Sequence, residues 1–90
     1  MRFNYRLHAL ERMFDRMIDP EEVEKAVLEG EIIEEYPEDK PYPSALNLYQ
    51  SGKGPLHVVY AKADDGFVII TVYRPDQERW EKGFRRRRKK

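Results

Sequence analysis

The sequence contains no cysteine and no long apolar segment. Without cysteine, the chain has no disulfide, no thiolate-bound metal and no thiol nucleophile. A membrane-spanning helix needs about 20 apolar residues, and no segment approaches that length. Residues 1–5 also lack the apolar core of a signal peptide. We therefore expect a cytoplasmic protein that does not interact with a membrane.

Histidine is scarce, and no glycine-rich motif is present. The only histidines are His8 and His57, which together with scattered carboxylates do not give the ligand spacing of a zinc site. Gly52 and Gly54 suit a turn rather than a phosphate-binding loop. No Ser-His-Asp arrangement for acyl transfer is recognisable. We expect neither a metal nor another cofactor.

The formal net charge is zero, because 17 basic residues balance 17 acidic ones, but the two signs occupy different segments. Residues 21–39 are strongly acidic, whereas the chain ends in a basic run. Such a run attracts a phosphate backbone without sequence preference; alternatively it is a solubilising, disordered tail. The candidate RNA-binding residues of this run are Arg85, Arg86, Arg87, Arg88, Lys89 and Lys90.

Two helices are predicted near the N-terminus. Residues 5–17 carry apolar side chains at helical spacing, and this stripe is expected to face the core. The second helix has Asp19 as a good N-cap, Pro20 at the first helical position and Gly30 as its stop. The stripe of the first helix consists of Leu10, Met13, Phe14 and Met17.

The rest of the chain has the pattern of a sheet. Ninety residues with 40% hydrophobic side chains suffice for one small domain with one core. A four-stranded antiparallel sheet needs a cover on one face, which the helices supply. The sequence thus predicts an α+β fold, with a helix hairpin packed on a four-stranded antiparallel sheet as a two-layer sandwich. The predicted strands are 31–36, 45–50, 56–62 and 67–73; residues 76–84 form a short helix or arm, 1–84 the single domain and 85–90 the disordered tail.

His8, Arg12 and Arg16 recur every four residues on the first predicted helix and form one slanting stripe. Arginine binds phosphate oxygens through two parallel hydrogen bonds, so this stripe suits a phosphate group. The alternative is a solvated face with local ion pairs, such as one between Arg12 and Asp15. Both interpretations are open at this point.

The position of His57 depends on strand register. An even-numbered turn after its strand places it opposite apolar residues of the last strand, as a hydrogen-bonded core histidine. A bulge or an odd turn places it instead with Thr71 and Tyr73, in a polar cluster. Histidine and tyrosine near arginine form a plausible acid–base set.

Several separated motifs resemble those of a bacterial and archaeal family that carries only a domain-of-unknown-function label. The likeness covers about residues 5–85, nearly the whole chain. The matching motifs are His-Ala-x-x-Arg-Met-x-x-Arg from His8, Ile-x-x-Glu-Glu-Val from Ile18, Tyr36 before Asp-x-Pro-Tyr-Pro-Ser from Asp39, Leu-His-Val-Val from Leu56, and Ile-Thr-Val-Tyr-x-Pro-Asp from Ile70 with Trp80.

This family resembles RelE/ParE-type and BrnT-like toxins, small α+β proteins of which many cleave mRNA without a metal. The resemblance implies a toxin-like, metal-independent endoribonuclease of a type II toxin–antitoxin pair, with RNA as substrate and an antitoxin as partner. The 2′-hydroxyl would attack the adjacent phosphate, with a histidine or tyrosine as acid or base. The alternative is a non-catalytic module that binds RNA or a protein. The implied catalytic residues are His8, Arg12, His57 and Tyr73, with Arg16 as an RNA contact.

Overall fold

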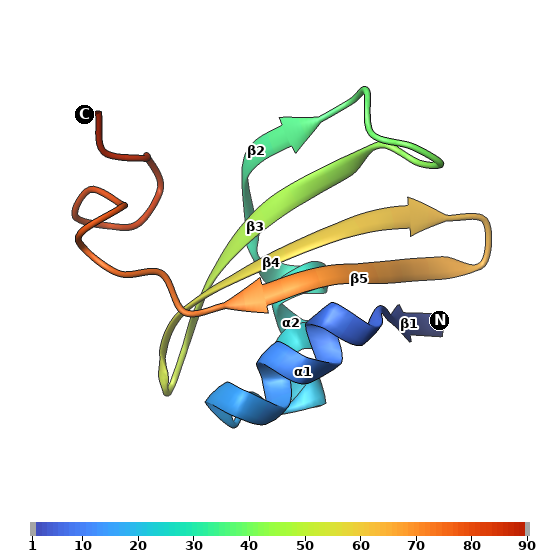
Figure 1. Cartoon of the computed structure of the whole chain (residues 1–90), viewed down its shortest axis with the longest axis horizontal. Helices are drawn as coiled ribbons and strands as arrows, with labels where there is room; N and C mark the ends of the chain where they lie inside the picture. The colour runs from blue at the N-terminus through green and yellow to red at the C-terminus, as the bar shows by residue number, and fades with distance from the viewer. Residues whose placement is uncertain (1, 90) are drawn as a thin grey trace.

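The computed structural model describes residues 2–89 of the chain. Helices lie on one side of a curved sheet, and the two chain ends lie at opposite ends of the molecule (Figure 1). In chain order the elements are β1 (Arg2–Tyr5), α1 (Leu7–Arg16), α2 (Pro20–Glu29), β2 (Glu31–Tyr36), β3 (Ser44–Ser51), β4 (Gly54–Ala63) and β5 (Gly66–Tyr73).

The sheet has five strands in the order β1-β5-β4-β3-β2. β1 runs parallel to β5, ending with Tyr5 opposite Ile69, and the other neighbours are antiparallel. The α+β class with two helices is confirmed, but the predicted four-stranded antiparallel sheet is wrong, because β1 adds a fifth, parallel strand. Its four residues are too few to show a clear alternating pattern, although Phe3 and Tyr5 do pack against the core.

The main core lies between the two helices and the sheet. On β4, Leu56, Val58 and Tyr60 face the helices, so alternation turns His57 and Val59 to the opposite face of the sheet. This opposite face carries the polar residues of interest. The buried core residues are Ala9, Met13, Ile18, Val23, Ala26, Val27, Leu56, Val58, Tyr60, Ile69 and Val72.

α1 meets the sheet with a different side from the one predicted. Ala9 and Met13 are buried, whereas Phe14 and Met17 are 85% and 82% exposed. Leu10 is also exposed, so the predicted inner stripe is right for Met13 and wrong for Leu10, Phe14 and Met17. β1 is the physical reason: its pairing with β5 continues in a hydrogen bond from the Arg6 amide, which fixes where α1 begins and which side faces the sheet.

A nearly buried ion pair joins α2 to the end of β5. Glu22 accepts hydrogen bonds of 2.7 and 3.0 Å from the Arg74 guanidinium and one of 2.5 Å from the Ser51 hydroxyl. Burial by itself raises the pKa of Glu22, but the bonds from Arg74 and Ser51 outweigh it and hold the pKa below its usual value. Because the carboxylate is the form that these donors stabilise, the pair stabilises the fold when Glu22 is charged.

Replacing Glu22 with glutamine tests this pair through the pH dependence of stability. At pH 7 we expect Glu22→Gln to lower the free energy of unfolding by about 2 kcal/mol. The depressed pKa means that this stability is present above the unfolded pKa of about 4.3 and is lost as the pH falls below it. Urea titrations at pH 7 and at acidic pH should therefore show the difference shrinking with acid. If wild type and Glu22→Gln differ in free energy of unfolding by the same amount at both pH values, the charged Glu22–Arg74 pair is not the source of that stability.

After β5, residues 76–89 form an arm, here called the C-terminal arm, rather than a helix. Trp80 and Arg87 form an isolated antiparallel bridge, and the Arg88 amide donates to the Arg79 carbonyl at 2.8 Å. The arm therefore doubles back on itself beside the sheet (Figure 1). Of the two forms that the sequence allows for residues 76–84, the arm is the one observed.

The basic segment of the arm is held against β2 by ion pairs. Arg85 contacts Glu31 at 2.8 Å, and Arg87 contacts Glu34 through two hydrogen bonds of 2.9 and 3.0 Å. The segment predicted to be a disordered tail thus folds back as far as Arg88. The final residue of that prediction, Lys90, lies outside the described residues.

Between residues 2 and 89, neither helix is long and apolar enough to cross a lipid bilayer.

Candidate functional site

The register between β4 and β5 brings His57 beside Tyr73. Between Val59 and Tyr60 the pairing shifts by one residue, because Ile70 of β5 has no partner on β4. Beyond this bulge, His57 lies directly opposite Tyr73. Without the bulge, the two-residue turn would place an apolar residue of β5 opposite His57. Because of the bulge, Tyr73 takes that position instead. Of the two registers left open by the sequence, the one with the polar pair is the register observed.

His57 is fully buried and fixed by two hydrogen bonds. Its Nε2 lies 2.9 Å from the Phe84 carbonyl oxygen, and its Nδ1 lies 3.1 Å from the Tyr73 hydroxyl. Since a carbonyl oxygen only accepts, Nε2 carries the proton; in a neutral imidazole Nδ1 is then the acceptor for the Tyr73 hydroxyl. The imidazole thus links the end of β5 to the C-terminal arm.

Burial shifts the pKa values of both His57 and Tyr73. Loss of solvent lowers the pKa of His57, which keeps the imidazole neutral, and it raises the pKa of Tyr73 to about 12. At neutral pH, Tyr73 is therefore a protonated phenol and a hydrogen-bond donor. It is not a base.

The C-terminal arm closes over His57. The Trp80 ring, 2% exposed, meets the imidazole edge to face at a centroid distance of 4.4 Å. The Arg87 guanidinium lies over the Trp80 ring, 4.6 Å from the ring centroid. Trp80 therefore anchors the arm to the sheet, and its indole is not accessible for stacking on a base.

A cleft of about 530 Å³ opens between α1, the second half of β5 and the C-terminal arm. It forms because β1 ends opposite Ile69, so that α1 and not a strand borders the rest of β5. The α1 wall carries His8, Arg12 and Arg16, the floor includes Thr71 and Tyr73, and the arm contributes Asp76, Arg79, Trp80 and Arg87.

The lining of this cleft is strongly cationic. Of the described residues that line it, five are arginines and only Asp76 is a carboxylate. Arg74 is paired with Glu22 and Arg87 with Glu34, whereas the remaining three have no ion-pair partner among residues 2–89. The unpaired arginines are Arg12, Arg16 and Arg79. The predicted alternative of an ion pair between Arg12 and Asp15 is therefore not observed.

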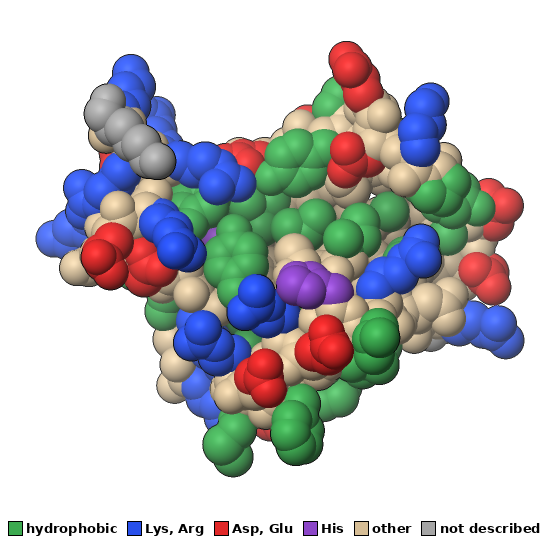
Figure 2. Space-filling model, viewed as in Figure 1, with side chains coloured by type: hydrophobic (Ala, Val, Ile, Leu, Met, Phe, Trp, Pro, Cys, Tyr) green, Lys and Arg blue, Asp and Glu red, His purple; other side chains and the backbone are tan. Residues whose placement is uncertain are grey.

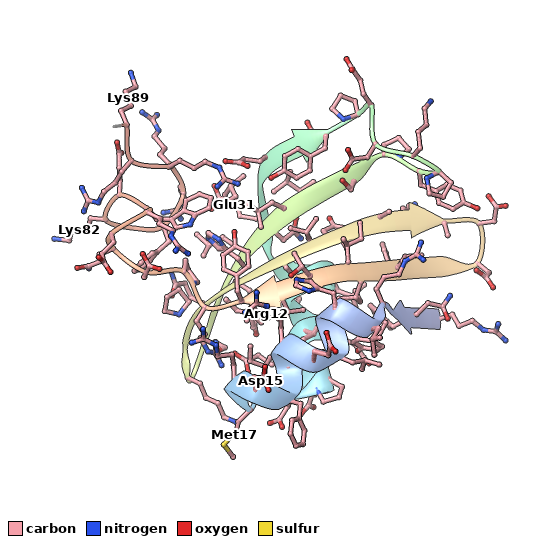
Figure 3. The ribbon with its side chains drawn as sticks, in the orientation of Figure 1. Arg12, Asp15, Met17, Glu31, Lys82 and Lys89 are labelled. Atoms are coloured by element: carbon pink, nitrogen blue, oxygen red, sulfur yellow. The ribbon has the colours of Figure 1, made fainter. Side chains whose placement is uncertain are left out.

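Basic side chains gather around hydrophobic ones where the arm approaches α1 (Figure 2). Arg12 extends from α1 over the end of β5, whereas Lys82 and Lys89 point away from the body at the outside of the arm (Figure 3). Such a concentration of like charge attracts anions to the cleft.

The structure therefore brings together most, but not all, of the candidate residues. His8, Arg12, Arg16 and Tyr73 share the cleft, and His57 lies behind Tyr73 without reaching its surface. Of the described part of the basic run, only Arg87 lines the cleft. Arg85, Arg86, Arg88 and Lys89 lie elsewhere on the arm, and Lys90 is outside the described residues.

Two arginines of the cleft were not among the candidates. Arg74 follows β5 directly, and Arg79 lies on the C-terminal arm before Trp80. The position of Arg74 after the Ile-Thr-Val-Tyr strand was a usable signal, because it leaves the sheet at the same end as Tyr73. Arg79 had no such signal, since the path of the arm depends on long-range ion pairs.

The sequence profile of a family described as "Domain of unknown function (DUF4258)" matches residues 5–74. The chain belongs to this family. No curated protein and no solved structure matches the chain. The DUF4258 match includes the α1 wall, Tyr73 and His57, whereas the arm with Arg79 and Arg87 lies beyond it.

The cleft of this DUF4258 protein has the parts needed for phosphate chemistry. Arginine side chains without acidic partners are suited to an anion, the Tyr73 phenol can donate a proton or a hydrogen bond, and His8 is exposed on the α1 wall. Among residues 2–89, no three histidine, aspartate or glutamate side chains cluster as ligands for a metal ion.

Proposed function

We propose that this DUF4258 protein is a metal-independent endoribonuclease of the toxin type, which cleaves mRNA in the cleft. One observation carries the proposal. The Tyr73 hydroxyl, oriented by buried His57, lies on the floor of a cleft whose α1 wall carries His8 and two arginines without acidic partners. The resemblance of the family to RelE/ParE-type and BrnT-like toxins, which is an analogy of fold, implies the same reaction class.

In this proposal, Arg12 and Arg16 bind the phosphate at the bond to be cleaved. Both extend from one side of α1, so they approach the phosphate from the same direction. Guanidinium groups form paired, charge-assisted hydrogen bonds to phosphate oxygens. They also stabilise the additional negative charge that develops in the transition state, which is a large contribution in enzymes of this kind.

The reaction is a transesterification within the RNA. His8 takes the proton of the ribose 2′-hydroxyl, and the 2′-oxygen forms a bond to the adjacent phosphorus. The bond from phosphorus to the 5′-oxygen breaks, and the Tyr73 hydroxyl turns its single proton away from His57 Nδ1 and donates it to that leaving oxygen. The products are a 2′,3′-cyclic phosphate and a free 5′-hydroxyl. His8 then loses its proton to solvent and the Tyr73 phenolate takes one up from solvent, which restores the starting state of the site.

His57 has a different role from the one expected on sequence grounds. A fully buried imidazole does not reach a substrate, so we assign it as a positioning residue. Its Nδ1 holds the Tyr73 hydroxyl, and the Phe84 carbonyl holds the imidazole in the tautomer that accepts this bond. The toxin proposal also includes a cognate antitoxin that neutralises the enzyme, and a cytoplasmic location where mRNA is found.

The proposal predicts RNA cleavage in the presence of a chelator. Purified full-length protein incubated with single-stranded RNA and EDTA should give new 5′-hydroxyl ends and 2′,3′-cyclic phosphate ends, which end-labelling before and after phosphatase treatment distinguishes. A parallel reaction with mRNA on ribosomes, in magnesium, tests whether the substrate must be presented by the ribosome. RNA that stays intact in both reactions would contradict the proposal.

The second candidate is a non-catalytic RNA-binding module, favoured by the burial of His57. It predicts RNA retention without new ends. Its affinity should fall steeply with salt, because each phosphate contact releases counterions.

A further inference from the structure

The outer side of α1 is apolar and exposed. Leu7, Leu10 and Phe14 fall within about 60° of one another around the helix axis, and the C-cap residue Met17 continues this line. Their exposed fractions are 71%, 47%, 85% and 82%. We call these four residues the α1 apolar stripe. Figure 3 shows Met17 at the free end of α1, pointing away from the body.

Scattered exposed apolar residues are ordinary, but a contiguous row on one helix marks a binding surface. Phe14 and Met17 are among the largest apolar side chains, so covering them with a partner removes a large apolar area from water. None of the four residues lines the cationic cleft. The stripe therefore lies outside the cleft, although Leu10 and Phe14 share a shallow hollow on α1 with His8 and Arg12. The inference does not rest on the proposed ribonuclease.

An acidic row borders the stripe. Glu11 and Asp15 follow it around the helix by about 40–80°, and both are exposed. Neither forms an ion pair with any residue between 2 and 89. Beyond them come His8 and the arginines of the cleft wall, so the acidic row separates the apolar stripe from the cationic cleft.

This charge pattern opposes self-association through α1. In a two-fold symmetric, antiparallel pairing of α1 with its copy, each acidic row faces the acidic row of the other copy, and like charges repel. The stripe is also small: ten helical residues span about 15 Å, whereas a standard interface covers about 800 Å² on each partner. A slender partner fits better than a second globular copy.

We propose that the α1 apolar stripe binds an amphipathic helix of another protein, whose apolar face is bordered by lysine or arginine. The apolar side chains of that helix cover Phe14 and Met17, and its basic border pairs with Glu11 and Asp15. Helix-in-groove recognition uses such anchors at spacings of three and four residues.

Two synthetic helices test the proposal against the full-length protein. Both peptides have the same leucine face; one is bordered by lysine and the other by glutamate, two residues of similar helix propensity. Fluorescence anisotropy at low salt should show at least about tenfold tighter binding of the lysine-bordered peptide. The double variant Glu11→Lys, Asp15→Lys should reverse this order.

Phe14→Ser and Leu28→Ser form a matched pair of variants. Phe14 lies in the stripe, whereas Leu28 is a 54% exposed apolar residue of α2 outside it. Phe14→Ser should lower the affinity for the lysine-bordered peptide by about tenfold or more. Leu28→Ser should leave the affinity for this peptide unchanged. Circular dichroism should be the same for both, since both side chains are exposed.

Equal affinity for the two peptides, no binding of either, or no effect of Phe14→Ser would overturn the proposal. Sedimentation equilibrium tests whether a second copy of the chain, rather than another protein, covers the stripe. A wild-type dimer that Phe14→Ser converts to a monomer would show that a second copy covers the stripe, and would likewise overturn it.

Discussion

Tyr73→Phe should lower the rate of RNA cleavage by about 100-fold or more, the range expected for loss of a positioned acid. The substitution removes a single oxygen, and the aromatic ring stays between His57 and the cleft. RNA affinity should change little, because the arginines that bind the phosphate are retained. Single-turnover cleavage and filter binding measure the two quantities separately.

Tyr5→Phe is the matched control for this variant. Its hydroxyl also makes one side-chain hydrogen bond, to Glu24 at 3.1 Å, but it does not line the cleft. Cleavage by Tyr5→Phe should equal that of the wild type. If Tyr73→Phe also cleaves within about twofold of wild type, well short of the loss of an acid, Tyr73 is not the proton donor.

His57→Ala should destabilise the fold by about 3 kcal/mol, a typical cost of a large-to-small change in a core. The substitution leaves a cavity under Trp80 and removes the partner of the Phe84 carbonyl and the Tyr73 hydroxyl. For a domain of this size, the melting temperature should fall by about 12–24 °C.

The other histidine provides the comparison. His8 is exposed on α1, so His8→Ala should change the free energy of unfolding by less than about 0.5 kcal/mol. Under the proposed mechanism it should nevertheless remove most of the cleavage. Equal stability of His57→Ala and wild type in thermal or urea unfolding would show that His57 does not hold the arm to the sheet.

Local signals in the sequence were sufficient for much of the fold. Asp19, Pro20 and Gly30 correctly marked the limits of α2, which runs from Pro20 to Glu29 with Asp19 at the N-cap position and Gly30 as its C-cap. These signals act within one turn of chain and need no tertiary information. The Asp19 side chain nevertheless makes no capping hydrogen bond and pairs with Lys53 at 3.1 Å.

Features that depend on distant parts of the chain were not predictable. β1 is four residues long and is held by β5, more than sixty positions later. Because β1 sets the rotation of α1, the exposure of Phe14 could not be read from helical spacing alone. The C-terminal arm is placed by Arg85 and Arg87, whose partners are 54 and 53 residues away.

In the candidate site, too, the local features were predictable and the long-range ones were not. The spacing of His8, Arg12 and Arg16 predicts a stripe, and a stripe is observed on the cleft wall. The sequence did not determine which residue of β5 lies opposite His57, because the register depends on a bulge at Ile70. Whether such a bulge forms depends on how the side chains pack on both faces of the sheet. Because of that bulge, Tyr73 lies opposite His57, and it lines the same cleft as His8, Arg12 and Arg16.

The most direct test uses an RNA in which the nucleotide before the main cleavage position carries a 2′-deoxyribose. If a 2′-hydroxyl is the nucleophile, this bond should remain intact in the presence of EDTA, while neighbouring bonds are cleaved at unchanged rates. Cleavage of the substituted bond at the wild-type rate would contradict the account, because no 2′-oxygen is then available to attack the phosphate.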